Sequence, residues 1–363
     1  MFHNPVVVGV FSNTNPSTST LQDLFAHCGN NTGNLLFSES LLRNIDCAKA
    51  GSLGLSVEGY QAYDSIVIAA ANWLNSKMDF AALADRLEKT KLPVVIVGLG
   101  AQAELDAKIP VLSSGTQRLV KLISERSSKI SVRGSFSAEV LEHYGINNVT
   151  VTGCPSLLLA GAAAPHIRHF EPEQTRDIAV GSTRHGFNPT DGFQAYFYRQ
   201  AFKQSMDIVL QSELSDMYFA LGRTNNEALL RRATDACSDF YQQSPEDVST
   251  YLKKHAKVFF DLNPWLKYMS HKSLYVGTRV HGAIASLLSG TPAVLVCHDS
   301  RTEEMARSLH IPHVLSKDID TTRDLDFSSL YYRDKQSMFE ASYVEYRSRF
   351  STFFQENGMR LTS

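Results

Sequence analysis

Residues 274–296 set the strongest constraint on how this chain can fold. They contain an apolar run at 274–276, a loop that begins with glycine, and helical apolar spacing over 280–288. A glycine and a proline at 290–292 then stop the pattern, and a second apolar run fills 293–296. This succession predicts a strand, a tight loop, a helix and a second buried strand.

The same alternation of strand and helix patterns continues through the rest of the chain. In the first half, strands are expected at 6–10, 65–69, 93–97, 129–132 and 149–152, and helices at 35–45, 80–88, 116–126 and 135–144. In the second half, strands are expected at 177–181, 217–221 and 258–260, and helices at 194–211, 227–236, 245–254 and 302–309. Such alternation predicts an α/β fold with parallel sheets and helices on both faces.

The length of 363 residues is too great for one ordinary core and suits two domains. We expect a Rossmann-like domain over 1–160, a linker over 161–177, a second Rossmann-like domain over 178–330, and a helical tail over 331–363. The tail is rich in aromatic residues, so it is expected to pack back across a domain face. Two such domains would face a cleft, and ligands of such sheets bind outside the carboxyl ends of the strands.

Composition excludes several classes of function. The net charge is −2, so nothing indicates a nucleic-acid partner or an anionic membrane surface. No apolar run approaches the roughly 18 residues of a membrane span, and a strand near residue 5 leaves no room for a signal peptide. Five cysteines, odd in number and without Cys-x-x-Cys spacing, favour reduced thiols in a cytoplasmic protein and no metal site. The oligomeric state is not indicated.

A candidate anion site lies in the loop after the strand at 274–276. Arg279 and His281 stand between the strand's carboxyl end and the first helical turn, where free N–H groups and the helix dipole favour an anion. An arginine fork and an imidazole at that point suit a phosphate or carboxylate ligand, with Gly277 and Thr278 forming the loop around it. The alternative is that Arg279 pairs with a surface acid and that His281 only caps or packs against the helix.

Arg133 repeats this arrangement in the first half, because it follows the expected strand at 129–132. Two arginines at strand ends, one in each domain, could converge on one small anion. Gly100 also ends a strand, where glycine lets the backbone approach a ligand. Arg184 and His185 follow the strand at 177–181 and are further candidates for ligand binding, although an ordinary polar loop is the alternative.

Several motifs resemble those of the polysaccharide pyruvyl transferase family. Ser131-Val-Arg-Gly-Ser-Phe-Ser137 and Val151-Thr-Gly-Cys-Pro-Ser-Leu-Leu158 are similar to its amino-domain signature. Gly277-Thr-Arg-Val-His-Gly-Ala-Ile284, Gly290-Thr-Pro292 and the following Asp299-Ser-Arg are similar to its carboxyl-domain signature. The resemblance covers roughly residues 28–315, and the Arg-x-His segment is its most specific part.

The resemblance implies a glycosyltransferase-B-like pair of domains and transfer of the enolpyruvyl unit of phosphoenolpyruvate to a saccharide. The product would be a pyruvate ketal, with release of phosphate and without any cofactor. Arg133 and Arg279 would hold the phosphate and carboxylate of the donor, and His281 would act beside the reacting carbon as a general acid or base. Free, lipid-linked, nucleotide-linked and polymeric saccharide acceptors all remain open.

One position departs from the family pattern. The family commonly carries Asn-x-Gly-Asp before its first long helix, whereas this chain has Asn31-Thr-Gly-Asn34. An amide in place of a carboxylate loses a possible base but keeps hydrogen bonding. Asn34 is therefore expected to cap its helix, and contact with the ligand remains open.

Two alternative functions remain open on the sequence alone. The first is a nucleotide-sugar-dependent glycosyltransferase, in which Arg279 would bind a diphosphate and Glu303 or Glu304 would reach the ribose. The second is a noncatalytic saccharide-binding relative that keeps the fold. The departure at Asn34 keeps this second alternative open, whereas the presence of Arg133, Arg279 and His281 argues against it.

Overall fold

The structure is a computed structural model that describes residues 1–12, 19–102, 108–171, 177–184, 192–222 and 226–362. The first half of the chain forms a parallel sheet in the order β2 (Lys49–Gly51), β1 (Pro5–Val8), β3 (Ser65–Ala69) and β4 (Val94–Val97). A parallel bridge between Leu99 and Val132 connects the β4 edge to a further pair, β5 (Ile130–Val132) and β6 (Val149–Val151). Strands β1, β3 and β4 are buried throughout, as expected where helices cover both faces of a parallel sheet.

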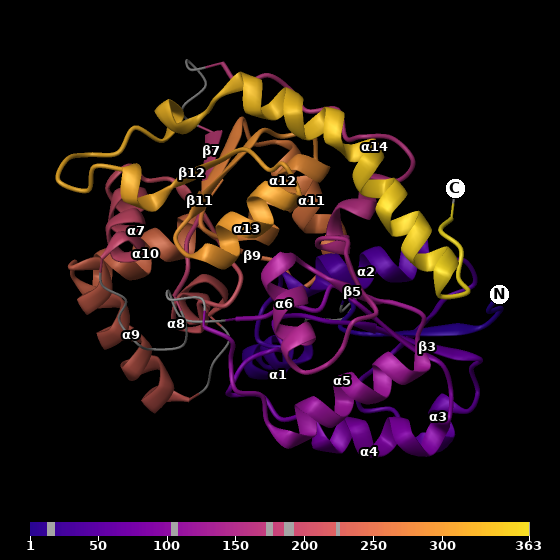
Figure 1. Cartoon of the computed structure of the whole chain (residues 1–363). Helices are drawn as coiled ribbons and strands as arrows, with labels where there is room; N and C mark the ends of the chain where they lie inside the picture. Colours follow the sequence, from indigo (N-terminus) through magenta and orange to yellow (C-terminus); the bar gives the residue numbers. More distant parts are fainter. Residues whose placement is uncertain (13–18, 103–107, 172–176, 185–191, 223–225, 363) are drawn as a thin grey trace.

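Helices surround this first sheet on both sides (Figure 1). One face is covered by α2 (Asn34–Asn44), whose apolar side chains Leu36, Phe37 and Leu41 are buried. On the other face lie α4 (Ala81–Thr90) and α5 (Ser114–Arg126), which also pack against each other. The remaining helices of this half are α1 (Leu21–His27), α3 (Val57–Tyr60) and α6 (Ser135–His143).

The second half forms a six-stranded, entirely parallel sheet. Its order is β12 (His313–Leu315), β11 (Ala293–Cys297), β10 (Leu274–Gly277), β7 (Ile178–Gly181), β8 (Asp207–Leu210) and β9 (Ala256–Val258). Its helices are α7 (Phe193–Lys203), α8 (Leu214–Leu221), α9 (Glu227–Tyr241), α10 (Pro245–His255), α11 (Leu262–Ser270), α12 (Val280–Leu288) and α13 (Ser300–Ser308). No helix among the described residues is long and apolar enough to cross a membrane.

Two expected elements of the second half are wrong. Residues 217–221, expected to be a strand, belong to helix α8, and the helix expected over 194–211 ends at Lys203. Ser205 adopts a left-handed conformation with φ of 52°, which breaks the helix and lets β8 begin at Asp207. Residues 208–210 and 217–219 are short apolar runs, and most of their side chains lie in one core. Periodicity does not separate strand from helix in such runs.

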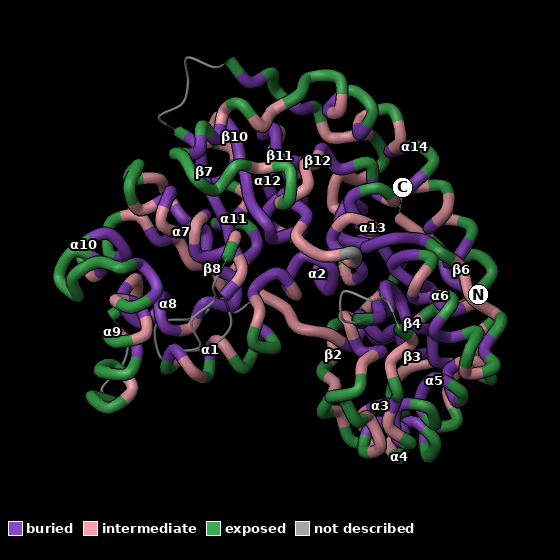
Figure 2. The backbone as a smooth tube through the Cα atoms, turned by 60° about the vertical axis from the view of Figure 1, so that its left-hand side comes forward, coloured by how far each residue is buried: buried purple, intermediate pink, exposed green. Residues whose placement is uncertain are grey.

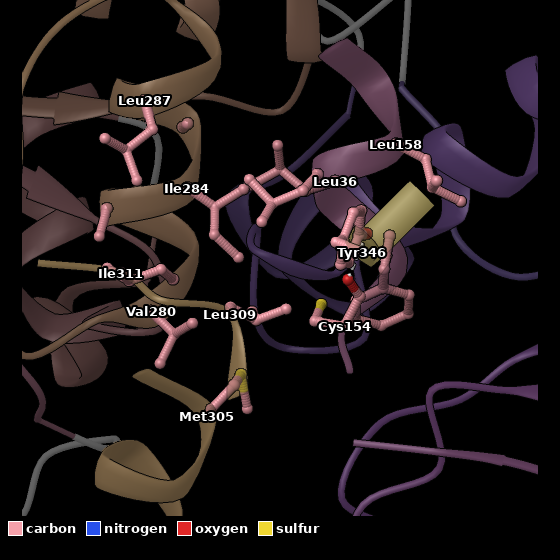
Figure 3. Close-up of a cluster of buried hydrophobic side chains, with 14 of the residues drawn as sticks. Leu36, Cys154, Leu158, Val280, Ile284, Leu287, Met305, Leu309, Ile311 and Tyr346 are labelled. Atoms are coloured by element: carbon pink, nitrogen blue, oxygen red, sulfur yellow. Dashed lines mark hydrogen bonds between the residues drawn. The ribbon is translucent and has the colours of Figure 1, made fainter. Parts of the chain in front are cut away.

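The two sheets share one continuous core, shown in part in Figure 3. Val280 and Ile284 of α12 lie in the same apolar cluster as Leu36 of α2 and Leu158 of the 3₁₀ helix η2 (Pro155–Ala160). Figure 2 shows buried backbone continuing from one half into the other through this region. A large apolar contact of this kind restrains the motion of one domain against the other.

The last helix, α14 (Arg333–Glu356), runs across both halves (Figure 1). The hydroxyl of Tyr346 donates to the carbonyl of Cys154 at 2.7 Å, and Arg349 Nη2 donates to the carbonyl of Ser308 at 3.4 Å. The first contact lies in the amino-terminal half and the second in the carboxyl-terminal half. The predicted fold is therefore confirmed: two Rossmann-like α/β domains face each other, and a carboxyl-terminal helix packs back across them.

Candidate functional site

A cavity of about 490 Å³ lies where the carboxyl ends of the two sheets face each other. This volume is within the range of about 300–1,000 Å³ that is usual for sites of small ligands. The wall from the first half comes from residues after β1, β2, β3, β4 and β5 and from α2, and the wall from the second half comes from residues after β7, β8, β10 and β11. Lining residues that follow a strand end include Val10, Ala71, Arg133, Thr183, Gln211, Thr278 and His298.

Arg133 places a buried positive charge on this cavity. Its side chain follows β5, is only 6% exposed, and donates from Nε to the Gly98 carbonyl at 2.7 Å and from Nη2 to the Ala70 carbonyl at 2.9 Å. The Phe37 ring lies 5.2 Å from the guanidinium carbon. No carboxylate of the described residues forms an ion pair with Arg133. A buried charge without a partner is costly, so the cavity favours an anionic ligand at this point.

Arg279 is positioned at the N-cap of α12 by a buried acid. Its Nη2 forms an ion pair with Glu213, which is fully buried, and its Nε donates to the Ser182 carbonyl at 3.2 Å. Burial raises the pKa of Glu213, but the ion pair with Arg279 and two backbone N–H donors outweigh it, so the net pKa of Glu213 is lowered. Arg279 thus does have an acidic partner, although this acid lies in the interior and not on the surface. The side chain still lines the cavity.

His281 lies beside both arginines at the start of α12. Its Nε2 is 3.7 Å from the sulfur of Cys154, and its ring lies 5.7 Å from the ring of Phe37. Burial, together with the charges of Arg133, Arg279 and Arg301, lowers the pKa of His281 to about 3. The imidazole is therefore neutral near pH 7, because its burial and three guanidinium groups oppose its protonation.

Other predicted residues are distributed unevenly around the cavity. Asn34 and Thr278 line it, and Gly100 lines a small adjoining hollow together with Arg133. Gly277 is not among the lining residues. A Cβ at Gly277 would lie 2.3 Å from the Gly181 carbonyl, so glycine is required there by the close approach of β7.

The structure does not bring Arg184 to the cavity. Its side chain is fully buried in the second half, where it forms an ion pair with Asp216 and lies over the Phe240 ring at 4.6 Å. Arg184 therefore belongs to the core beneath α8 and α9. His185, the neighbouring candidate, lies outside the described residues.

The expected cap by Asn34 is also wrong. Gly33 is the N-cap of α2, and Asn34 is the first helical residue. Its Nδ2 donates to the carbonyls of Cys28 at 3.0 Å and Gly29 at 3.3 Å. The amide therefore fastens the preceding loop, a task that a carboxylate cannot perform because it has no hydrogen to donate.

Several cavity residues were not identified as site candidates from the sequence, and three of them stand out by their chemistry. Arg301, in the first turn of α13, lines both the cavity and the small hollow and forms an ion pair with Asp299 at 3.2 Å. Gln211 is 1% exposed, and its Nε2 has no hydrogen-bond partner among the described residues. His298 follows β11; burial lowers its pKa, and nearby Arg301 adds to this effect. Gln211 and His298 follow strand ends, so the rule that selected Arg133 could have selected them too.

The lining of the cavity has a distinct chemical character. Its charged side chains are Arg133, Arg279 and Arg301, and no Asp, Glu or Lys of the described residues lines it. Uncharged hydrogen-bonding side chains include two histidines, the amides of Asn31, Asn34, Asn72, Gln102 and Gln211, and the hydroxyls of Ser38, Thr183, Thr278 and Thr302. No group of three or more His, Cys, Asp or Glu side chains that could hold a metal occurs in the described part of the chain. The arrangement suits a small, multiply charged anion beside a polar uncharged molecule.

Comparison with solved structures gives remote similarities. A putative UDP-N-acetylglucosamine 2-epimerase from Listeria monocytogenes is 9% identical, with a TM-score of 0.41 and coverage of 99% of this chain and 92% of that chain. The Anabaena protein HepE in complex with UDP and glucose is 10% identical, with a TM-score of 0.41 and coverage of 96% of this chain and 99% of that chain. No curated protein matches the sequence.

The comparison with protein families is decisive. The model of the family described as polysaccharide pyruvyl transferase matches residues 11–300, and most of the residues that line the cavity lie within this range. The motifs around Arg133, Arg279 and His281 lie within it as well. The chain belongs to the polysaccharide pyruvyl transferase family.

Proposed function

We propose that this protein transfers the enolpyruvyl unit of phosphoenolpyruvate to two hydroxyl groups of a saccharide, giving a pyruvate ketal and phosphate. The observation that carries the proposal is the buried guanidinium of Arg133, which no carboxylate of the described residues neutralises. Phosphoenolpyruvate carries negative charge on both its phosphate and its carboxylate. Arginine is well suited to bind both groups because its planar fork matches their oxygens.

The three arginines would divide these charges. Arg279 is held in place by Glu213, so its position is preorganised but its charge is largely balanced. Arg301 forms an ion pair with Asp299, the N-cap residue of α13, and it also lines the small hollow beside Arg133. Arg133 and Arg301 are therefore the groups that would most stabilise the departing phosphate, which gains charge as its bond to C2 breaks.

The reaction requires two proton transfers. C3 of the donor gains a proton, C2 gains two bonds to sugar oxygens, and the C2–O bond to phosphate breaks. One of the two hydroxyl protons accounts for the proton on C3, and the other leaves with phosphate or solvent. His281 is the imidazole beside Arg133 and Arg279, so we assign it the role of moving these protons.

Donor binding would prepare His281 for this role. Without a bound anion, burial and three arginines hold its pKa at about 3, where it is a weak base. The charges of phosphoenolpyruvate would offset those of the arginines, so the pKa of His281 would rise on binding. The imidazole would therefore be a stronger base with the donor in place than without it.

Thermal denaturation with phosphoenolpyruvate tests the proposal. The wild type should be stabilised by about 2.7 kcal/mol at roughly a hundred times the dissociation constant. Arg133→Gln should lose this protection, and Arg231→Gln, which changes an exposed arginine of α9, should keep it. Arg279→Ala is a poorer choice, because it would leave Glu213 buried without its partner. Wild-type protein that phosphoenolpyruvate does not protect, in buffer free of phosphate, would contradict the proposal.

The glycosyltransferase alternative has less support in the site. It needs an acid that reaches a ribose, but Glu303 pairs with Arg307 at 2.6 Å, and Glu304 accepts from the backbone N–H of Phe136 at 2.8 Å. Neither lines the main cavity. UDP in the same denaturation experiment is therefore expected to protect the protein less than phosphoenolpyruvate does.

A measurement of turnover distinguishes an enzyme from a noncatalytic relative. The wild type should release phosphate, and His281→Ala should abolish this release.

A further inference from the structure

The wall of the cavity formed by the loops after β2, β3 and β4 differs from the rest. Trp73, Met78 and Phe80, which we call the apolar shelf, lie together there. The rings of Trp73 and Phe80 stack with their centroids 4.5 Å apart and their planes inclined by 30°. Trp73 is 8% exposed and Met78 is 37% exposed, so the shelf is anchored in the core at one side and open at the other.

The lining residues of this wall carry no charge within the described part of the chain. The neighbours of the shelf in the cavity wall are uncharged, namely Leu53, Asn72 and Gln102. Asp79 lies between two shelf residues in the sequence, but it is not among the lining residues and accepts from the backbone N–H of Ala81 at 3.0 Å. Among the residues that the structure describes, a ligand on the shelf would therefore meet an apolar surface and amide groups, and no ionic partner.

Asn72 connects the shelf to the arginine end of the cavity. Asn72 Oδ1 and Arg133 flank Gly100, since a Cβ there would lie 2.6 Å from that oxygen and 3.2 Å from Cδ of Arg133. Asn72 Oδ1 is buried and has no hydrogen-bond partner among the described residues. A buried carbonyl oxygen of this kind requires a donor, and a sugar hydroxyl is such a donor.

We propose that the apolar shelf and Asn72 form the subsite for the saccharide, and that the sugar unit bound there is an uncharged pyranose. A pyranose ring presents a face of C–H groups that packs on an indole, while its edge presents hydroxyls. On Trp73 the ring would direct a hydroxyl to Asn72 and so toward the site of Arg133. This inference rests on the proposed function, and it adds the class of acceptor and its place.

Fluorescence can test the subsite, because Trp73 and Trp265 are the two tryptophans of the chain. Trp265 is fully buried in α11, so Trp265→Phe leaves Trp73 as the reporter. Methyl β-D-glucopyranoside, methyl β-D-galactopyranoside and methyl α-D-mannopyranoside serve as neutral probes. Methyl β-D-glucuronide is the charged counterpart, and sorbitol is the control without a ring. At least one neutral glycoside should change the emission of Trp73 in a saturable way, and sorbitol should not.

Variants then locate the binding. Trp73→Ala should weaken glycoside binding, measured by calorimetry, by on the order of tenfold. Met78→Ala should weaken it by a smaller factor, and it removes a partly exposed side chain, so it tests the shelf even if Trp73→Ala does not fold. Tyr332→Ala, which removes an exposed aromatic ring at the start of α14, should leave binding unchanged.

These experiments distinguish an error in the proposed donor from an error in the proposed saccharide site. If no neutral glycoside changes the fluorescence emission of Trp73 in protein that phosphoenolpyruvate still protects, the shelf is not the saccharide site. Tighter binding of the glucuronide than of every neutral probe would contradict the proposal that the sugar on the shelf is uncharged. If glycosides bind but phosphoenolpyruvate gives no protection, the sugar site stands and the proposed donor is wrong.

Discussion

At the scale of single residues, the site combines one unbalanced charge with one suppressed base. Arg133 keeps its guanidinium buried on two backbone carbonyls, and this arrangement costs stability until an anion arrives. His281 stays neutral because its burial and the arginines beside it both oppose a further positive charge. A bound anion would relieve both conditions at once.

The suppressed base has a consequence for stability against pH. The pKa of His281 is about 3 in the folded protein and about 6.5 when unfolded, so the unfolded state binds the proton first as pH falls. The contribution of the neutral His281 to the free energy of unfolding is therefore complete above pH 6.5. It is lost as the pH falls from 6.5 to 3. The loss is at most about 1.4 kcal/mol for each pH unit. His281→Asn should show a shallower fall in unfolding free energy by urea titration between pH 6.5 and 4. Equal slopes for the two proteins would contradict the assignment.

Asn34 gives a second prediction at this scale. Asn34→Asp should lower the free energy of unfolding by about 1–3 kcal/mol near neutral pH, because a carboxylate would face the carbonyls of Cys28 and Gly29 without a hydrogen to donate. Asn34→Ala is the control and should cost less, since it removes the donor without adding a charge. Urea denaturation measures both. An aspartate variant as stable as the wild type would show that the amide does not fasten this loop.

At the scale of elements, α13 caps a helix of the other domain. Glu304 accepts from the backbone N–H of Phe136 at 2.8 Å and from the Ser135 hydroxyl at 3.0 Å, in the first turn of α6. A carboxylate at a helix N-terminus is favourable because it satisfies a free donor and the helix dipole. A Cβ at Gly134 would lie 2.3 Å from this carboxyl carbon, so glycine lets the two helices meet.

This contact is open to test with two neighbouring glutamates. Glu304→Ala should lower the unfolding free energy by about 1 kcal/mol, as the loss of a helix cap does. Glu303→Ala should change it by no more than about 0.5 kcal/mol, because Glu303 only pairs with Arg307 on the surface of the same helix. Chemical denaturation of the two variants side by side gives the comparison. Equal costs would mean that the contact between α13 and α6 adds nothing to stability.

The elements also show how far local patterns reach. The stretch from β10 to β11 could be predicted closely, because its apolar runs are separated by a glycine loop and a glycine–proline stop. The stretch from α7 to α8 could not, since a left-handed Ser205 divides it and no glycine or proline signals the break. Helix α1 was also missed, although Thr20 and Asp23 form a capping box at its start.

The site residues likewise include some that the sequence could predict and some that it could not. The rule that ligands meet strand ends correctly predicts that Arg133, Thr278 and Arg279 line the cavity. The same rule misplaces Arg184, because a strand end does not determine whether a long side chain turns outward or back into the core. The partners Asp216 and Glu213 lie far along the chain from Arg184 and Arg279, so only tertiary structure brings these pairs together.

At the scale of the whole molecule, the shared core makes the two domains one folding unit. Each domain holds one tryptophan, Trp73 in the first and Trp265 in the second. Trp73→Phe and Trp265→Phe therefore each report the unfolding of one domain by fluorescence. Allowing for the effect of each substitution on total stability, far-ultraviolet circular dichroism and fluorescence should give the same urea midpoint within each variant. A fluorescence midpoint that precedes the dichroism midpoint in either variant would show that the domains unfold separately.

The position of α14 bears on how the chain is made. One face of the first sheet shares its apolar cluster with Tyr343, Tyr346, Phe350, Phe353 and Phe354. On a ribosome, α2 would already cover this face as the first domain emerges, but the part of the cluster on which α14 packs would stay uncovered until the last helix had been synthesised. Its folding would then not be finished domain by domain as translation proceeds, as is usual for large proteins. The nascent chain would instead carry an exposed apolar surface through most of its synthesis, and it would be a substrate for chaperones during that time.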